Sequence, residues 1–416
     1  MFHQRRFRVM SCSGAAMLFA LTFHSNAFAT AGCDLMAGLD LPNTTITLAQ
    51  SVEAGKSTNL PAYCRVTATL KPSMDSDIHI EVWMPETGWN GKYLAAGNGG
   101  WGGSIVTGDL ATGLRRGYAT SSTDTGHTGG GAFALGHPEK VIDFGYRAIH
   151  ETTLKSKAII TAFYGSGPTF SYWNSCSAGG RQGLDEAQRY PTDFDGIIAG
   201  APAVNWTGRA IQSIWVAQAM HNDEASYIPP TKYPALHAAA LQACDELDRV
   251  KDGVIENPRI CKFDPKVLEC RNGDAASCLT TPQVEASRKV YSAVNDPRTG
   301  REIFPGQEPG SEANWANLGG PTPLGIALDE MKYVVFNDAN WDYKSFHFDR
   351  DIEKVDRADA GIINALNPNL GPFFARKGKI IQYHGWADQQ ISPMSSVNYY
   401  TSVYQTLGGT GKTFSS

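Results

Sequence analysis

The stretch of sequence that says most about the fold is Thr169–Gly180, which reads TFSYWNSCSAGG. Thr169–Asn174 is rich in β-branched and aromatic residues, which is typical of a short strand. The turn Ser175–Gly180 follows, and Arg181–Arg189 after it has a helical pattern. A strained turn between a strand and a helix lifts a serine hydroxyl above the sheet, and small neighbours leave room for it. The stretch therefore predicts an α/β fold with Ser177 as a nucleophile.

Two other interpretations of this turn stay open. Ser175 stands where such a turn usually has its first glycine, so Ser177 also suits an ordinary turn in which its hydroxyl caps the helix. Cys176 is a second candidate nucleophile, although a cysteine in an oxidising compartment usually forms a disulfide. The preceding strand, the two glycines Gly179 and Gly180, and the following helix favour Ser177.

Strand and helix patterns alternate on both sides of this turn. The expected strands are 78–84, 92–96, 197–200 and 379–383, and the expected helix is 144–163. This alternation is typical of an α/β protein. It is lost after Asn205, where Trp, Pro, Asn and Asp are common, and we interpret that region as an inserted lid domain. The chain then divides into a first part of the core, 30–204, a lid, 205–368, and an incomplete second part of the core, 369–416.

The composition narrows the class of protein. The 416 residues include 36 basic and 41 acidic side chains, which gives a formal net charge of −5. Hydrophobic residues make up 42% and charged residues 19%, so the chain is too apolar for a disordered protein. A nucleic-acid-binding protein needs a clustered positive surface, which an acidic balance does not favour.

Residues Met1–Ala29 have the pattern of a secretory signal peptide. Three arginines precede the short apolar run Gly14–Phe23, and Ala27-Phe28-Ala29 matches a small-x-small cleavage site. The apolar run is about half as long as a membrane-spanning helix, and no later segment is long and apolar enough to span a bilayer. We therefore expect a secreted or periplasmic protein without a membrane anchor.

The exported protein has an odd number of cysteines. Cys12 leaves with the signal peptide, so seven of the eight cysteines remain. Disulfides are the default in an exported protein. Closeness in sequence suggests the pairs Cys244–Cys261 and Cys270–Cys278, which leaves Cys33–Cys64 as an N-terminal pair. Cys176 is then left over, either as a free thiol or with a partner outside this chain.

A catalytic acid is expected after a late strand, because the α/β-hydrolase order is Ser, then acid, then His. Asp388 fits this place, and its carboxylate would orient an imidazole. No histidine follows Asp388 in the sequence; the last is His384, which we assign to the turn, and His127 is expected to be a loop histidine. The chain ends in a glycine-rich stretch, 408–413, that reads as an unfinished connection, so we expect a sequence cut short at its C-terminus.

Nine motifs together resemble the tannase and feruloyl esterase family of exported α/β-hydrolases. They are 89–92 (WNGK), 97–100 (GNGG), 124–127 (DTGH), 134–140 (ALGHPEK), 142–147 (IDFGYR), 176–183 (CSAGGRQG), 199–202 (AGAP), 340–342 (NWD) and 383–388 (YHGWAD). The resemblance implies an α/β-hydrolase core with a large inserted lid domain. Ser177 and Asp388 match the positions of the family's serine and aspartate.

The resemblance also bears on Cys176 and on the missing base. In that family a cysteine beside the nucleophile is bonded to a cysteine beside the catalytic histidine. The resemblance therefore implies that the partner of Cys176 and the histidine both lie beyond Ser416.

A calcium site in the lid is implied by the same resemblance. The loop 244–254 (CDELDRVKDGV) would bind Ca²⁺ through the carboxylates of Asp245, Asp248 and Asp252 and the carbonyls of Val250 and Val254. An all-oxygen shell suits a hard cation, although the acid spacing is not that of an EF-hand. Arg249 stands where the family has a glycine. The alternative is a solvated acidic loop closed by the Cys244–Cys261 disulfide.

The implied activity is hydrolysis of feruloyl, galloyl or related small aromatic esters through an acyl-enzyme on Ser177. The backbone N–H of Ala178 and that of Gly99 or Gly100 would form the oxyanion hole. Lid aromatics such as Trp206, Trp215 and Trp341 would hold the acyl group.

Two further functions remain open. One is another acyl esterase of the same fold, and the other is a catalytically inactive, calcium-stabilised exported binding protein. We expect a small ester substrate as the partner, no nucleic acid and no membrane, while the sequence does not specify an oligomeric state.

Overall fold

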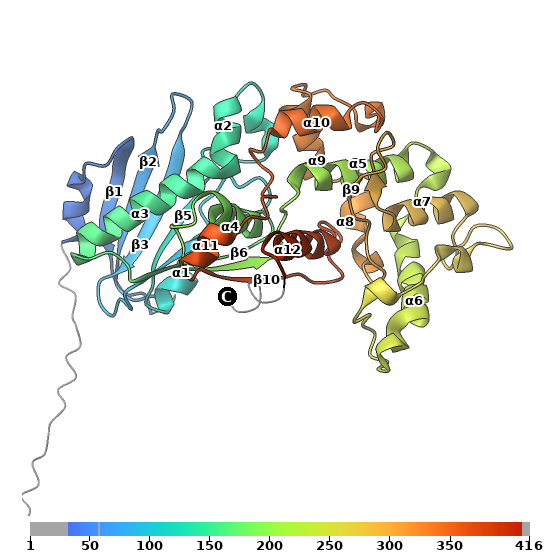
Figure 1. Cartoon of the computed structure of the whole chain (residues 1–416), viewed down its shortest axis with the longest axis horizontal. Helices are drawn as coiled ribbons and strands as arrows, with labels where there is room; N and C mark the ends of the chain where they lie inside the picture. The colour runs from blue at the N-terminus through green and yellow to red at the C-terminus, as the bar shows by residue number, and fades with distance from the viewer. Residues whose placement is uncertain (1–31, 57–58, 410–416) are drawn as a thin grey trace, which may run out of the picture.

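An eight-stranded mixed sheet forms the centre of the larger part of the molecule (Figure 1). The computed structural model describes residues 32–56 and 59–409, so the predicted signal peptide at 1–29 lies outside the described residues. The strand order is β1-β2-β3-β5-β4-β6-β7-β10. The strands are β1 (Thr44–Val52), β2 (Tyr63–Leu70), β3 (Ile78–Pro85), β4 (Lys92–Ala96), β5 (Ala119–Thr123), β6 (Phe170–Cys176), β7 (Gly196–Gly200) and β10 (Lys379–Tyr383).

The two halves of the sheet differ in strand direction. The pairs β1–β2, β2–β3 and β3–β5 are antiparallel, whereas β5, β4, β6, β7 and β10 run parallel. Parallel strands need crossover connections, which helices supply. The helices of this part are α1 (Thr107–Arg115), α2 (Pro138–Ile142), α3 (Ala148–Tyr164), α4 (Ala178–Arg189), α11 (Gly371–Ala375) and α12 (Met394–Thr406). The predicted α/β class is confirmed.

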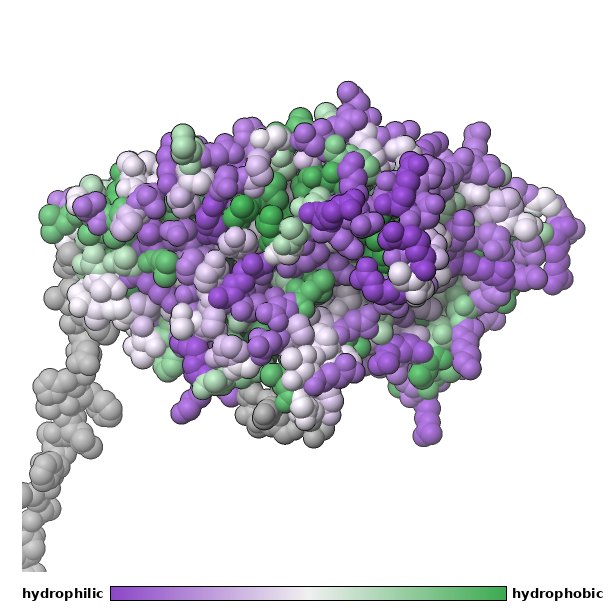
Figure 2. Space-filling model, turned by 45° about the horizontal axis from the view of Figure 1, so that its top comes forward, coloured by the Kyte–Doolittle hydropathy of each residue, from purple (hydrophilic) through white to green (hydrophobic). Residues whose placement is uncertain are grey.

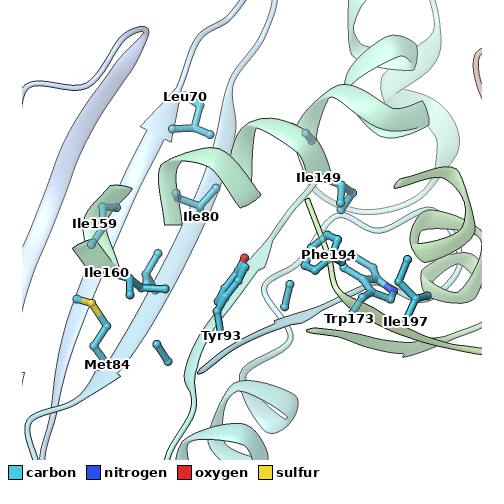
Figure 3. Close-up of a cluster of buried hydrophobic side chains, with 14 of the residues drawn as sticks. Leu70, Ile80, Met84, Tyr93, Ile149, Ile159, Ile160, Trp173, Phe194 and Ile197 are labelled. Carbon is cyan, nitrogen blue, oxygen red and sulfur yellow. The ribbon is translucent and has the colours of Figure 1, made fainter. Parts of the chain in front are cut away.

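Alternate residues of β3 face two different helices. Ile80 and Met84 belong to the main core, into which α3 also packs, and Figure 3 shows Ile159 and Ile160 of α3 close to them. Trp83, on the opposite face, packs with residues of α1. The strand period of two residues therefore places α1 and α3 on opposite sides of the sheet.

The lid region is mainly helical and is continuous with the core at two neighbouring points. It leaves the core at Val204 and returns at Ala365, whose N–H donates to the Val204 carbonyl at 2.9 Å. Figure 1 shows most of its helices beside the sheet, on the right of the view. Its elements are α5 (Trp206–His221), α6 (Tyr233–Cys244), α7 (Thr281–Tyr291), β8 (Val294–Asn295), β9 (Glu302–Phe304), α8 (Ala316–Gly319), α9 (Gly325–Asp329) and α10 (Ile352–Asp359).

Two disulfides close loops of the lid and a third fastens the N-terminal part of the core. The pairs are Cys33–Cys64, Cys244–Cys261 and Cys270–Cys278, as expected from the sequence. Cys176 is the free cysteine among the described residues, and it is exposed. Within residues 32–56 and 59–409 no helix has the length and apolarity needed to cross a membrane. Hydrophilic side chains dominate the face shown in Figure 2, with hydrophobic ones in scattered groups between them.

The structure differs from the expected elements in two places. Helix α4 begins at Ala178, directly after Ser177, whereas the sequence suggested Arg181. The helix expected at 144–163 begins with a π-helical segment, η3 (Asp143–Arg147), and continues as α3 until Gly165, which has a φ of 72°. A residue with positive φ ends a helix, and glycine adopts that conformation without steric cost.

Candidate active site

Ser177 occupies a strained turn between β6 and α4. Its φ is 63° and its ψ is −124°, a conformation that non-glycine residues rarely adopt. Its side chain makes no capping hydrogen bond to α4, so the alternative of a simple helix cap is not what the structure shows. A Cβ on Gly179 would lie 2.0 Å from Ser175 Oγ, and one on Gly180 would lie 2.5 Å from the Gly200 carbonyl oxygen. The two glycines therefore allow α4 to begin directly against the sheet.

The ends of three parallel strands meet beside this turn. Cys176 of β6 pairs with Gly200 of β7, which in turn pairs with Tyr383 of β10. The Ser177 N–H donates to the Gly200 carbonyl at 2.9 Å, and the Ala201 N–H donates to the Tyr383 carbonyl at 2.7 Å. Since parallel strands end at the same edge of a sheet, the turn with Ser177 and the turn that follows β10 lie at one edge.

Asp388 lies in the turn after β10 and is held there by three donors. Its Oδ1 accepts the N–H groups of Gln390 and Ile391 at 2.9 and 3.0 Å, and its Oδ2 is 3.2 Å from His384 Nε2. Although burial alone would raise the pKa of Asp388, the hydrogen bonds from His384, Ile391 and Gln390 hold it below its ordinary value. Asp388 is therefore a carboxylate at neutral pH.

His384 has both ring nitrogens engaged. Because an ionised Asp388 can only accept, His384 Nε2 donates to it, and Nδ1 then accepts from the Ser396 hydroxyl at 2.7 Å. Neither nitrogen has a lone pair directed elsewhere in this arrangement. His384 therefore acts as a partner of Asp388 within the turn, and it does not offer Ser177 a base.

The loop after β4 is fastened to the start of α4 by two side chains. The Asn98 N–H donates to Gln182 Oε1 at 3.0 Å, and Gln182 Nε2 donates to Asn98 Oδ1 at 3.2 Å. Asn98 and Gln182 are both buried. These bonds place Gly99 and Gly100, which follow Asn98 directly, near the N-terminus of α4 and the buried Ala178.

A cluster of buried aromatic side chains lies against Ala178. It includes Trp101, Phe144 and Trp206, with ring centroids 4.9 to 5.4 Å apart. Trp341, by contrast, belongs to a separate hydrophobic cluster of the lid, and Trp215 packs against that cluster. Of the three lid tryptophans expected to hold an acyl group, the structure therefore brings only Trp206 next to Ala178.

His127 belongs to the same aromatic region. Its ring stacks on Phe133 at 3.6 Å, and its Nδ1 is 3.4 Å from Thr125 Oγ1. Burial lowers the pKa of His127, so the ring is neutral at neutral pH. The placement agrees with the expectation of a loop histidine.

Arg181 is a positioning residue that the sequence argument did not single out. Its Nη1 donates to the carbonyls of Gly145 and Ile363 at 2.8 and 2.9 Å, and its Nη2 donates to that of Phe144 at 3.3 Å. The fully buried guanidinium thus ties the first turn of α4 to η3 and to the segment that returns from the lid. Its closeness to Ser177 in sequence was the available signal, but its partners are distant in sequence.

The predicted calcium loop contains oxygen donors, but its carboxylates are occupied by backbone donors. Asp245 accepts N–H groups of Asp252 and Gly253 at 3.1 to 3.2 Å. Asp248 Oδ1 accepts the Val250 N–H and Asp252 Oδ1 accepts the Val254 N–H. Arg249 has a φ of 77°, which explains why a glycine suits that position.

The donor chemistry of this loop suits a hard cation. In the described part of the chain, however, a group of three His, Cys, Asp or Glu ligand atoms within 4.8 Å of one another occurs at a different place. The carboxylates of the three loop aspartates do not lie this close together. Ca²⁺ would have to draw them together. Calcium binding therefore stays a prediction.

Comparison with known proteins gives a consistent result. A family described as "Tannase and feruloyl esterase" matches residues 64–414. An uncharacterized esterase of Xanthomonas campestris pv. campestris is 38% identical over 91% of this chain and 71% of its own length. A probable feruloyl esterase B-1 of Aspergillus oryzae is 36% identical over 83% of this chain and 65% of its own length, so the chain spans about two thirds of that relative.

Solved structures support the same assignment. The crystal structure of feruloyl esterase B from Aspergillus oryzae superposes with a TM-score of 0.85 at 33% identity, covering 90% of this chain and 78% of that one. The tannin acyl hydrolase from Aspergillus niger shares the fold, with a TM-score of 0.76 at 22% identity over 91% of this chain and 79% of that one. The chain therefore belongs to the tannase and feruloyl esterase family of carboxylic ester hydrolases.

Proposed function

We propose that the protein hydrolyses esters of aromatic acids through an acyl-enzyme on Ser177. The observation that supports this most is the strained Ser177 turn, at the same sheet edge as the turn that holds Asp388 as a carboxylate. Strain of this kind costs about 1–3 kcal/mol and is concentrated at functional sites. A serine held in this way, with no capping bond, is suited to nucleophilic attack.

The reaction has two halves in this proposal. Ser177 Oγ attacks the ester carbonyl while a histidine accepts its proton, and the tetrahedral intermediate then expels the alcohol, which receives that proton. Water repeats the sequence on the acyl-enzyme and releases the acid. The N–H of Ala178 and that of Gly99 or Gly100 would stabilise the oxyanion, each donor contributing about 3 kcal/mol.

Asp388 serves as the acid that orients the imidazole and stabilises its charged form. His384 does not supply the base, because its two nitrogens are engaged with Asp388 and Ser396. The family resemblance implies a histidine base that follows the acid in chain order. An alternative base within the chain would have to come from a rearranged His384.

An aromatic acyl group is favoured by two observations. Trp101, Phe144 and Trp206 gather against Ala178, next to the nucleophile. The Aspergillus oryzae relative is named a probable feruloyl esterase B-1, and one of the superposed crystal structures is that of feruloyl esterase B. A small rearrangement of this cluster would offer a flat apolar surface to a phenolic ring, because aromatic rings pack well against one another.

The proposal is tested by measuring hydrolysis of a panel of aryl and alkyl carboxylic esters. Ser177→Ala is expected to abolish turnover in a chain that also carries the family's histidine, while Ser175→Ala, the neighbouring hydroxyl, retains most of it. Full activity of Ser177→Ala would refute the nucleophile. A preference for short alkyl acyl groups would instead favour another esterase of the same fold.

The 416-residue chain itself provides a second test. If no histidine acts as a base beside Ser177, the chain's rate of ester hydrolysis is expected to lie below that of a complete triad by a factor of about 10⁴ or more, because the serine then loses most of its catalytic advantage. A near-native rate from this chain, lost on His384→Gln, would show that His384 is the base after all.

We also propose that the protein is exported and that the lid loop binds Ca²⁺. The disulfides support an oxidising compartment. Ca²⁺ held by Asp245, Asp248 and Asp252 with the carbonyls of Val250 and Val254 would stiffen the lid, at a distance from the chemistry. Calcium is expected to raise Tm, and Asp248→Asn to remove that effect; an equal rise in both proteins would contradict the site.

A further inference from the structure

Three potential metal ligands meet away from the candidate active site. They are His150 of α3, Glu186 of α4 and Asp193 of the loop between α4 and β7, and their ligand atoms all lie within 4.8 Å of one another. Glu186 is nine residues beyond Ser177 along α4, which corresponds to roughly 14 Å at the rise of an α-helix. The cluster is therefore separate from the nucleophile.

Glu186 has an unsatisfied carboxylate oxygen at the centre of this cluster. The side chain is 1% exposed, and its Oε2 has no hydrogen-bond partner among the described residues. Asp193 is 4% exposed, so two carboxyl groups are buried next to each other. Burying an ionised carboxylate without a partner is costly, and natural proteins pair such groups or place a metal ion beside them.

The charged neighbour of the cluster does not satisfy these oxygens. The Lys157 ammonium donates to the backbone carbonyl of Asp193, not to either carboxylate. Burial lowers the pKa of Lys157. Among the described residues, Lys157 therefore forms no ion pair with the carboxylate of Glu186 or with that of Asp193.

His150 is held in place by two contacts. Its Nδ1 is 2.7 Å from Asp193 Oδ2, and its ring stacks on Tyr190 with a centroid distance of 3.6 Å. Its side chain is 22% exposed, so the cluster is accessible from solvent on the imidazole side. An oriented imidazole beside two carboxylates gives one nitrogen and at least two oxygen donors from three separate segments.

We propose that His150, Glu186 and Asp193 form a binding site for a divalent transition-metal ion of the zinc type. One imidazole and two carboxylates are a mixed donor set that suits Zn²⁺ better than Ca²⁺, which prefers oxygen alone. Water would complete the tetrahedral shell on the exposed side. The ion would hold α3, α4 and the loop before β7 together, and so has a structural role.

A proton is the competing way to neutralise the pair. Burial raises the pKa of Glu186 well above its ordinary value, so in the metal-free protein Glu186 can share a proton with Asp193. The two states differ in a measurable way, because a metal ion displaces that proton and adds one equivalent of bound metal.

The test measures zinc bound per chain, by titration calorimetry and by elemental analysis after dialysis, with Ca²⁺ in millimolar excess so that the lid loop is not counted. The wild-type chain is expected to bind one equivalent of Zn²⁺ more than Glu186→Gln, which keeps the size of the side chain. His150→Gln is expected to lose the same equivalent. Zn²⁺ is expected to raise the Tm of the wild type by at least about 2 °C and that of the variants by less.

The matched control is His237→Gln in the lid. His237 Nδ1 lies 2.9 Å from Glu312 Oε2, so it is also a half-buried histidine paired with a buried carboxylate, but it is not part of a three-ligand group. This variant is expected to bind as much zinc as the wild type. Equal zinc binding by wild type and Glu186→Gln would overturn the proposal. A wild-type chain that binds no zinc at this site, and whose acid stability changes on Glu186→Gln, would also overturn it, because a proton alone would then neutralise the pair.

Discussion

Arg181→Met should destabilise the protein strongly, because Arg181 fastens the start of α4 to two other parts of the chain. Its guanidinium is fully buried and donates three hydrogen bonds to the carbonyls of Phe144, Gly145 and Ile363. It also lies 5.2 Å from the Phe144 ring and 5.8 Å from the Trp206 ring. Methionine fills much of the same volume but offers no donor.

The expected loss follows from these contacts. A buried carbonyl that loses its donor costs about 1–3 kcal/mol, so three of them cost about 3–9 kcal/mol. Part of this is recovered, because burying a cation itself costs several kcal/mol in real proteins. Burial lowers the pKa of Arg181 to about 10, which reflects that cost and still leaves the group charged at neutral pH. We expect a net loss of about 2–5 kcal/mol in the free energy of unfolding.

The measurement is urea unfolding followed by tryptophan fluorescence, which reports on the neighbouring Trp206. The control is Arg357→Met, since Arg357 is 68% exposed and pairs with Glu353 at the surface at 3.0 Å. Exposed pairs contribute about 0–1 kcal/mol, so this variant should unfold close to the wild type. If Arg181→Met also unfolds within about 1 kcal/mol of the wild type, the role assigned to the buried guanidinium is refuted.

Three further outcomes are expected. Gly180→Ala should cost about 1–3 kcal/mol of stability, because its Cβ would lie 2.5 Å from the Gly200 carbonyl oxygen and force α4 away from β7. The pKa of Asp388 is lower in the folded protein than its unfolded value of about 4, so its carboxylate stabilises the protein above that value. This stabilisation is lost as the pH falls through the folded pKa. Asp388→Asn should therefore reduce the fall in Tm between about pH 7 and pH 3. Ile381 is 60% exposed on β10, which pairs only with β7 among the described strands, so Ile381→Lys should reduce concentration-dependent association in light scattering.

Each of these outcomes has a control. Gly108→Ala in α1 meets no atom within 4 Å, so it should be neutral or stabilising by up to about 1 kcal/mol, and a similar loss at both glycines would contradict the close-approach argument. An unchanged acid limb in Asp388→Asn would show that the carboxylate is not stabilised in the folded state. Leu35→Lys changes an equally exposed residue away from the sheet edge, at 63% exposure. If it reduces association as much as Ile381→Lys, general surface polarity and not the strand edge is responsible.

The sequence alone predicted those features whose signal is local. The strands β3, β4, β6, β7 and β10, helix α3, and the turn with Ser177 all follow from periods of two or 3.6 residues and from glycine positions within a dozen residues. The two lid disulfides followed from closeness in sequence, since a short loop brings two cysteines together without knowledge of the fold, and Cys33–Cys64 was the pair that remained. The place of Asp388 followed from chain order.

Tertiary structure alone decided the features that depend on residues distant in sequence. It separated Trp206 from Trp215 and Trp341, engaged both nitrogens of His384, and buried Arg181 against Ile363. It also brought His150, Glu186 and Asp193 together from a helix, a second helix and a loop. The local sequence pattern around a residue predicts its secondary structure. The contacts of its side chain depend on how whole elements pack against one another, and the periodicity within one segment does not specify that packing.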